Sequence, residues 1–86
     1  MYQIVYERRV QKDLDKIQDH DVERILEVIR ELSLNPLLPG HKKLSGKPNL
    51  YRVKQGDYRV LYSFDAKIQE LRIVLVSHRK ESYRHL

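Results

Sequence analysis

Four basic residues in the second half of the chain have the types and spacing of a phosphate-binding surface: Arg52, Lys54, Arg59 and Arg79. Alternate side chains of an extended strand share a face, so Arg52 and Lys54 would lie on one side about 7 Å apart, at a rise of about 3.3 Å per residue. Arg59 can face the same way on the next strand. Like charges at neighbouring strand positions repel, and a protein tolerates them most readily where an anion binds. One such cation would be an ordinary solvent-facing residue, but the four together favour phosphate binding.

The basic charge is concentrated in one half of the 86 residues. The net charge is +5 overall. Residues 1–40 carry six Lys and Arg against eight Asp and Glu, whereas residues 41–86 carry eleven against four, which gives net charges of −2 and +7. A concentrated positive field attracts polyanions and speeds their arrival. A basic but inert surface is the alternative, and charge alone favours polyanion binding only slightly.

The residues available for other phosphodiester chemistry are few. Metal-dependent cleavage needs clustered carboxylates or histidines, but the acidic residues of the second half are scattered and the histidines lack metal-ligand spacing. There is no cysteine, no glycine-rich lysine loop and no legible Ser–His–Asp set, so we expect neither a metal nor a cofactor. Metal-free RNA cleavage remains, in which the substrate's 2′-hydroxyl attacks the adjacent phosphorus while the protein moves protons and neutralises charge. Arginine suits the last task, and a lysine flanked by cations could act as the base.

Hydrophobic periodicity predicts two helices in the first half of the chain. Val10, Leu14 and Ile17 form the apolar stripe of a short helix. Apolar residues three and four positions apart predict a second helix over 22–32, which begins after acidic residues and ends before Pro36. Two short helices joined by a tight turn form an αα-hairpin.

The remaining segments favour strands. Residues 2–6 alternate and predict a first strand, and three more are expected at 50–54, 58–64 and 71–76. The last of these is almost continuously apolar, as in a strand covered on both faces. Residues 35–49 hold all three prolines and two of the three glycines and predict a loop, whereas the polar residues 78–84 suggest a short terminal helix.

This order of elements predicts an α+β fold: an N-terminal strand, an αα-hairpin, and then an antiparallel β-meander, all in one sheet with the helices on one face. The length allows one domain, residues 1–86. No apolar run approaches the roughly 18 residues of a membrane span, and residues 1–8 do not resemble a signal peptide. We therefore expect a small, soluble, cytoplasmic domain that does not bind membranes.

Several segments together resemble the RelE/ParE superfamily of toxins from toxin–antitoxin pairs, and the RelE branch most: residues 43–46, 50–54, 56–62 and 78–84. The similarity extends over almost the whole chain. The combination of segments is fairly specific, although no single segment is. The resemblance implies a RelE-like fold and a metal-independent endoribonuclease that enters the decoding site of the ribosome and cuts the messenger RNA there.

The resemblance also assigns roles to individual residues. Lys54 matches a proposed general base, Arg59 an arginine that holds the scissile phosphate, and Arg79 a proposed acid or charge stabiliser. Tyr83 matches a terminal tyrosine that orients a messenger base. Arg52 stands where well-known relatives have lysine, a mild change because the position needs charge more than proton transfer. Further RNA contacts are expected from Lys43, Lys47, His78 and Lys80, of which His78 could also donate a proton.

The implied partners are the ribosome, messenger RNA and a cognate antitoxin, acidic overall or locally, which masks the active surface in a toxin–antitoxin hetero-oligomer. Two alternatives remain open. One is a ParE-type inhibitor of DNA gyrase, which would have no need of the basic residues named above. The other is an RNA- or ribosome-binding module without catalysis.

Overall fold

The computed structural model describes residues 1–81. Two helices and five strands follow one another along the chain in the order β1 (Gln3–Tyr6), α1 (Arg8–Asp15), α2 (Asp19–Leu34), β2 (Lys42–Lys43), β3 (Tyr51–Gln55), β4 (Tyr58–Asp65) and β5 (Glu70–His78). This is the mixed α+β fold predicted from the sequence.

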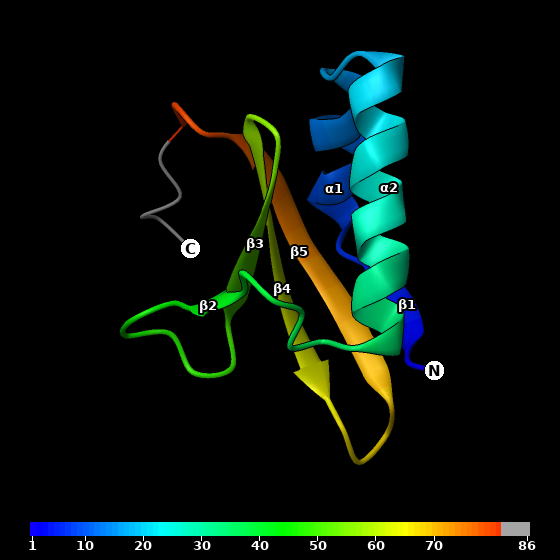
Figure 1. Cartoon of the computed structure of the whole chain (residues 1–86), viewed down its shortest axis with the longest axis vertical. Coiled ribbons are helices and arrows are strands. Elements are labelled where there is room, and N and C mark those ends of the chain that lie inside the picture. Colours follow the sequence, from blue (N-terminus) through cyan, green and yellow to red (C-terminus); the bar gives the residue numbers. More distant parts are fainter. Residues whose placement is uncertain (82–86) are drawn as a thin grey trace.

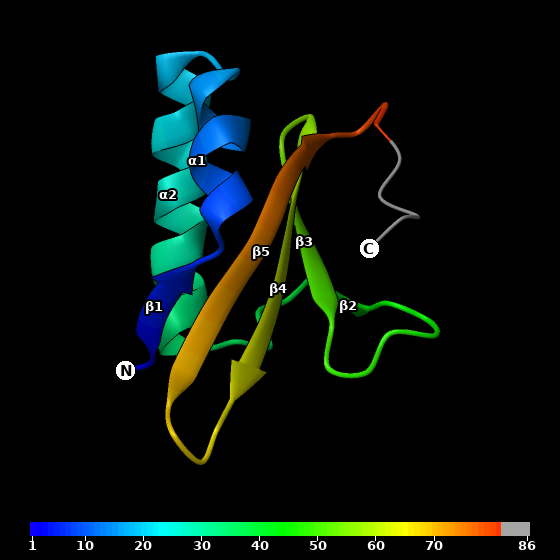
Figure 2. The same cartoon turned by 180° about the vertical axis from the view of Figure 1, so that it is seen from behind.

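All five strands belong to one sheet, in the order β1-β5-β4-β3-β2. The pairs β2–β3, β3–β4 and β4–β5 are antiparallel, as the meander predicts. The first strand instead pairs in parallel with the last one. This is possible because the helical hairpin follows β1 and carries the chain across one face of the sheet to β2 at the opposite edge. Figures 1 and 2 show both helices on the same side of the sheet.

The hydrophobic core lies between the helices and this face of the sheet. On α2 the buried residues Ile25, Ile29 and Leu32 recur at the helical period, and Val10 is the buried residue of α1. The strands β3, β4 and β5 contribute the side chains that face the helices: Val53, Val60, Tyr62, Leu71, Ile73 and Val76. Because strand side chains alternate, the residues between these positions point to the opposite face.

A register shift between β4 and β5 changes this alternation near the end of the sheet. Leu61 is paired with Leu75, but the next residue, Tyr62, is paired with Ile73, so Val74 is the extra residue of a bulge. Before the bulge, Leu71 and Ile73 face the helices; after it, Val76 does. The bulge therefore turns Leu75 and Ser77 toward the face that carries no helix.

Three local expectations need correction. The segment 35–49 is not entirely a loop, because Lys42–Lys43 pairs with β3 as a short edge strand. The first helix ends at Asp15, so Ile17 lies in the following turn and packs on the core from there. The last strand continues to His78, where a terminal helix had been expected to begin; residues 79–81 form a turn and a bend. The rest of that segment lies outside the described residues. No helix within residues 1–81 has the length and hydrophobicity needed to cross a membrane.

Candidate functional site

The face of the sheet that carries no helix collects basic side chains from β2, β3 and β4. Arg52 and Lys54 flank the core residue Val53, and Arg59 precedes the core residue Val60, so alternation directs all three away from the helices. The β3–β4 register places Lys54 directly opposite Arg59. We call this surface the basic face and define it by Lys42, Arg52, Lys54, Arg59, Leu61, Leu75 and Ser77.

The cations of the basic face are not neutralised by acidic residues in the described part of the chain. Within residues 1–81, Arg52, Lys54 and Arg59 form no ion pair with a carboxylate. Arg72 differs: its guanidinium lies 2.9 Å from Glu70 and 3.9 Å from Glu7. Among the described residues, nothing compensates the positive charge of the basic face, and directly opposed like charges cost stability. Such an arrangement suits a polyanionic ligand.

Arg59 is partly enclosed by its surroundings. Its side chain is half-buried, and its Nη1 atom is buried without a hydrogen-bond partner in the described part of the chain. An unpaired buried guanidinium nitrogen is costly, but its fork of donors fits the oxygens of a phosphate. Neighbouring Lys54 is exposed, so its amine is open to solvent.

Arg79 lies beyond the end of β5, beside the tight turn that joins β3 to β4. Its backbone N–H donates to the carbonyl of Asp57 at 2.7 Å, and its Nε lies 3.6 Å from Oδ1 of the same residue. Both side chains are more than half exposed, so the pair is weak. The backbone bond fixes Arg79 near the Lys54 end of β3, while the side chain stays accessible.

The other sequence-predicted residues are more dispersed. His78 points to the helix side, where its ring packs edge-on against Tyr58 at 5.4 Å between centroids. After the bulge in β5, it is Ser77 and not His78 that points to the basic face. Lys43 is paired with Tyr51 and shares the helix-side parity. Lys47 lies in the loop between β2 and β3, and Lys80 lies in the turn after β5; both are exposed. Tyr83 lies outside the described residues.

Comparison with known proteins places the chain in a family. Residues 4–83 match the family described as "ParE toxin of type II toxin-antitoxin system, parDE". The chain belongs to the RelE/ParE superfamily of type II toxins. Toxin RelE3 of Methanocaldococcus jannaschii is 33% identical over 84 residues, which cover 93% of each protein. The sequence-based assignment to this superfamily is thus confirmed.

Solved structures of relatives share the fold. The archaeal RelE–RelB complex from Pyrococcus horikoshii contains a chain with a TM-score of 0.79 and 30% identity, and the match covers 94% of this toxin and 98% of that chain. The toxin–antitoxin complex RelBE2 of Mycobacterium tuberculosis gives a TM-score of 0.81 at 26% identity, covering 91% and 98%. The family description names ParE whereas these relatives are named RelE, so the branch of the superfamily must be argued from the site.

Lys42 is a basic-face residue of the toxin that the sequence analysis missed. It is paired with Arg52 across β2 and β3, so it shares the face of Arg52, whereas the predicted residue Lys43 does not. Two residues between proline- and glycine-rich segments are too few to show the alternation of a strand, so the sequence did not predict this placement. The pairing extends the row of basic residues to the edge of the sheet.

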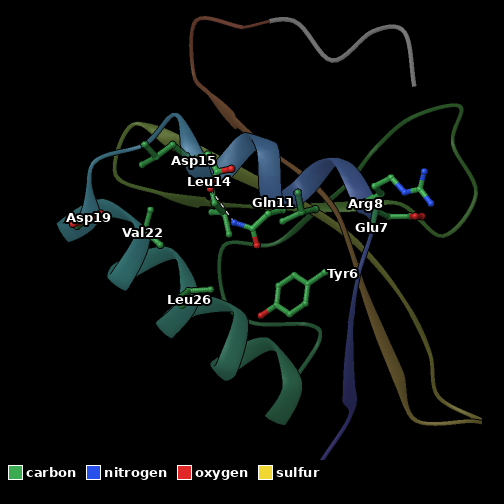
Figure 3. Close-up of a pocket in the computed structure, with 11 residues that line it drawn as sticks. Tyr6, Glu7, Arg8, Gln11, Leu14, Asp15, Asp19, Val22 and Leu26 are labelled. Atoms are coloured by element: carbon green, nitrogen blue, oxygen red, sulfur yellow. Dashed lines mark hydrogen bonds between the residues drawn. The ribbon is translucent and has the colours of Figure 1, made fainter.

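A groove on the helix side of the toxin is separate from the basic face. It has a volume of about 620 Å³ and opens between α1, α2 and β1. Figure 3 shows Tyr6 lying between the two helices, with Leu14 from α1 and Val22 and Leu26 from α2 around it. Burial raises the pKa of Tyr6 above its usual value. The lining is mixed: apolar side chains alternate with charged and polar ones such as Glu7, Arg8 and Asp15. Residues 1–81 hold no group of three or more His, Asp or Glu side chains placed to bind a metal.

Proposed function

We propose that this toxin is a ribosome-dependent endoribonuclease that cleaves messenger RNA without a metal and so stops translation in the cytoplasm. The observation that carries the proposal is the convergence of Arg52, Lys54 and Arg59 on one face of the sheet, with no carboxylate paired to them within residues 1–81. A phosphodiester bound there supplies the missing negative charge. The 33% identity to a toxin named RelE3 supports the same branch.

The arrangement suits cleavage by the substrate's own 2′-hydroxyl. Lys54 accepts the 2′-hydroxyl proton while the oxygen attacks phosphorus. Arg59 and Arg52 balance the charge that develops on the non-bridging oxygens. The bond from phosphorus to the 5′-oxygen then breaks as the 2′,3′-cyclic phosphate forms. The leaving oxygen takes a proton from solvent water beside Arg79, whose charge stabilises the oxygen as it leaves. We assign Tyr83 to orienting a messenger base.

The proposed partners follow from the same surface. RelE chains in the Pyrococcus and Mycobacterium structures are bound in toxin–antitoxin complexes, and we propose a hetero-oligomer with a cognate antitoxin here. A net charge of +7 over residues 41–86 favours an acidic partner that covers the basic face. Lys43, Lys47, Lys80 and His78 would contact RNA or ribosome outside the reaction centre.

Mapping messenger 5′ ends after a short induction of the toxin tests this function. We expect translation to stop and new ends to accumulate within ribosome-bound messages. Arg59→Ala should remove both effects, whereas the matched control Arg72→Ala, which changes an arginine already paired with acids, should retain them. Unchanged message ends with wild-type toxin on ribosomes would leave a binding module and overturn the nuclease.

Inhibition of DNA gyrase is the second candidate, because the matching family is described as ParE. It predicts a fall in DNA supercoiling while translation initially continues. The two functions separate at Lys54: Lys54→Ala should restore growth for a nuclease, whereas it should leave a gyrase inhibitor toxic. Plasmid topology and protein synthesis, measured in the same induced cells, distinguish them.

A further inference from the structure

Two buried polar atoms on the basic face have no hydrogen-bond partner within residues 1–81: Nη1 of Arg59 and Oγ of Ser77. Arg59 and Ser77 are directly opposite each other in the β4–β5 register. Side chains of such a pair leave the sheet on the same face, with Cβ atoms about 4.5–5.5 Å apart. Two unpaired donors from neighbouring strands are therefore held side by side.

Ser77 is unusual among the buried residues of the described chain. It is 6% exposed, and Ser33 is the other buried polar residue there. Ser33 satisfies its hydroxyl in the ordinary way, by donating to the carbonyl of Arg30 at 2.6 Å. Ser77 makes no such bond, although alanine or valine at this strand position would avoid the cost of an unpaired hydroxyl. A polar ligand that enters from the basic face would explain the serine.

The bulge in β5 is what brings this hydroxyl to the site. If Val74 took part in a regular ladder, strict alternation from Ile73 would direct Ser77 toward the helices and would place Val76 opposite Arg59. The observed register does the opposite, with Val76 in the core and His78 against Tyr58. Because of the bulge, the side chain opposite Arg59 is a small neutral donor rather than the apolar side chain of Val76.

We propose that Ser77 is a second phosphate ligand: its hydroxyl donates a hydrogen bond to a non-bridging oxygen of the RNA phosphodiester that Arg59 binds. The proposal rests on the proposed RNA-cleaving function. Arg59 supplies charge and a planar fork, whereas Ser77 adds a donor of fixed position without increasing repulsion among the cations. Its function is to fix the rotation of the phosphate relative to Lys54.

Equilibrium binding of a short RNA oligonucleotide with 2′-O-methyl riboses tests the assignment, because this probe cannot be cleaved. We expect Ser77→Ala to weaken binding about tenfold, the loss typical of a hydrogen bond to a charged group, and Ser77→Thr to retain most of the affinity. The matched control is Ser63→Ala, a half-buried serine of the same face that is paired with Arg72 near the other end of β4. It should bind as wild type does.

Thermal unfolding separates a ligand contact from a structural role. If the hydroxyl is unpaired in the free toxin, Ser77→Ala should have an unchanged or higher Tm. Unaltered binding by Ser77→Ala, or weaker binding accompanied by a lower Tm, would overturn the assignment, as would failure of the wild type to bind the probe. Binding without cleavage of natural messages would refute the nuclease function while leaving the Ser77 contact in place.

Discussion

Lys54 and Arg59 are cross-strand partners at the end of the β3–β4 hairpin, with their Cα atoms directly opposite and their side chains on the same face. Neither has a carboxylate partner within residues 1–81. The hairpin thus places a compact ammonium next to a planar guanidinium. This pair connects the stability of the sheet to the proposed chemistry, because the repulsion that a bound phosphate relieves is present in the free toxin.

Lys54→Ala should therefore lower activity without lowering stability. Removal of one of two opposed cations relieves a repulsion worth about 0.2–1 kcal/mol, so Tm should rise slightly at low salt and less at high salt. Loss of a general base should reduce cleavage at least about 100-fold. Thermal unfolding and message cleavage on ribosomes measure the two effects.

The matched control for this variant is Lys67→Ala, an exposed lysine in the turn between β4 and β5. It removes the same charge from the protein and should change neither cleavage nor the salt dependence of Tm. A drop in Tm for Lys54→Ala larger than that for Lys67→Ala would contradict the repulsion at the hairpin.

Arg59→Lys should remain impaired even though it preserves the charge. A lysine ammonium is a point charge and cannot reproduce two parallel hydrogen bonds to a phosphate. We expect cleavage to fall by at least about tenfold while the protein stays folded, as measured by message cleavage on ribosomes and by circular dichroism. Full activity of this variant would count against a bidentate phosphate contact.

The sequence predicted the parts of the fold that depend on periodicity. The stripe on α2 and the alternation in β3 and β4 follow directly from burial on one face, so Arg52, Lys54 and Arg59 were placed correctly on a shared side. The terminal position of β1 beside β5 has no local signal, since parallel pairing with the last strand depends on where the helices carry the chain. Lys42–Lys43 is likewise a strand only because β3 is beside it.

The part of the site that the sequence could not predict depends on the bulge. The segment 71–76 is so apolar that alternation between the two faces cannot be followed through it. The sequence pattern therefore does not show that Val74 is an extra residue. His78 was a candidate for the site, but the observed register places it beside Tyr58 and places Ser77 opposite Arg59. A buried, unpaired hydroxyl is visible only in three dimensions.

Asp57→Asn should show that the Arg79 contact is not essential to the fold. The Arg79–Asp57 ion pair is exposed and 3.6 Å long, and such pairs contribute at most about 1 kcal/mol. The backbone bond from Arg79 to Asp57 remains in the variant. We expect the free energy of unfolding from urea denaturation to change by less than about 1 kcal/mol, and cleavage to stay equal or rise because the Arg79 side chain is released. A loss of cleavage would instead assign Asp57 a part in the site.

Tyr62 should make the stability of the toxin sensitive to alkaline pH. The side chain is fully buried, its hydroxyl donates to the carbonyl of Pro36, and burial, with a smaller contribution from Tyr51, raises its pKa to about 12. The pKa of tyrosine in an unfolded chain is about 10, so the folded state holds the hydroxyl proton more tightly. The contribution of the protonated Tyr62 hydroxyl to folding stability is fully present below pH 10 and is lost as the pH rises from about 10 to about 12.

Tyr62→Phe leaves the Pro36 carbonyl unpaired and should lower the free energy of unfolding by about 1–3 kcal/mol at neutral pH. Urea denaturation between pH 7 and pH 12 should show a smaller alkaline loss for this variant than for wild type, and parallel curves would contradict the role of Tyr62.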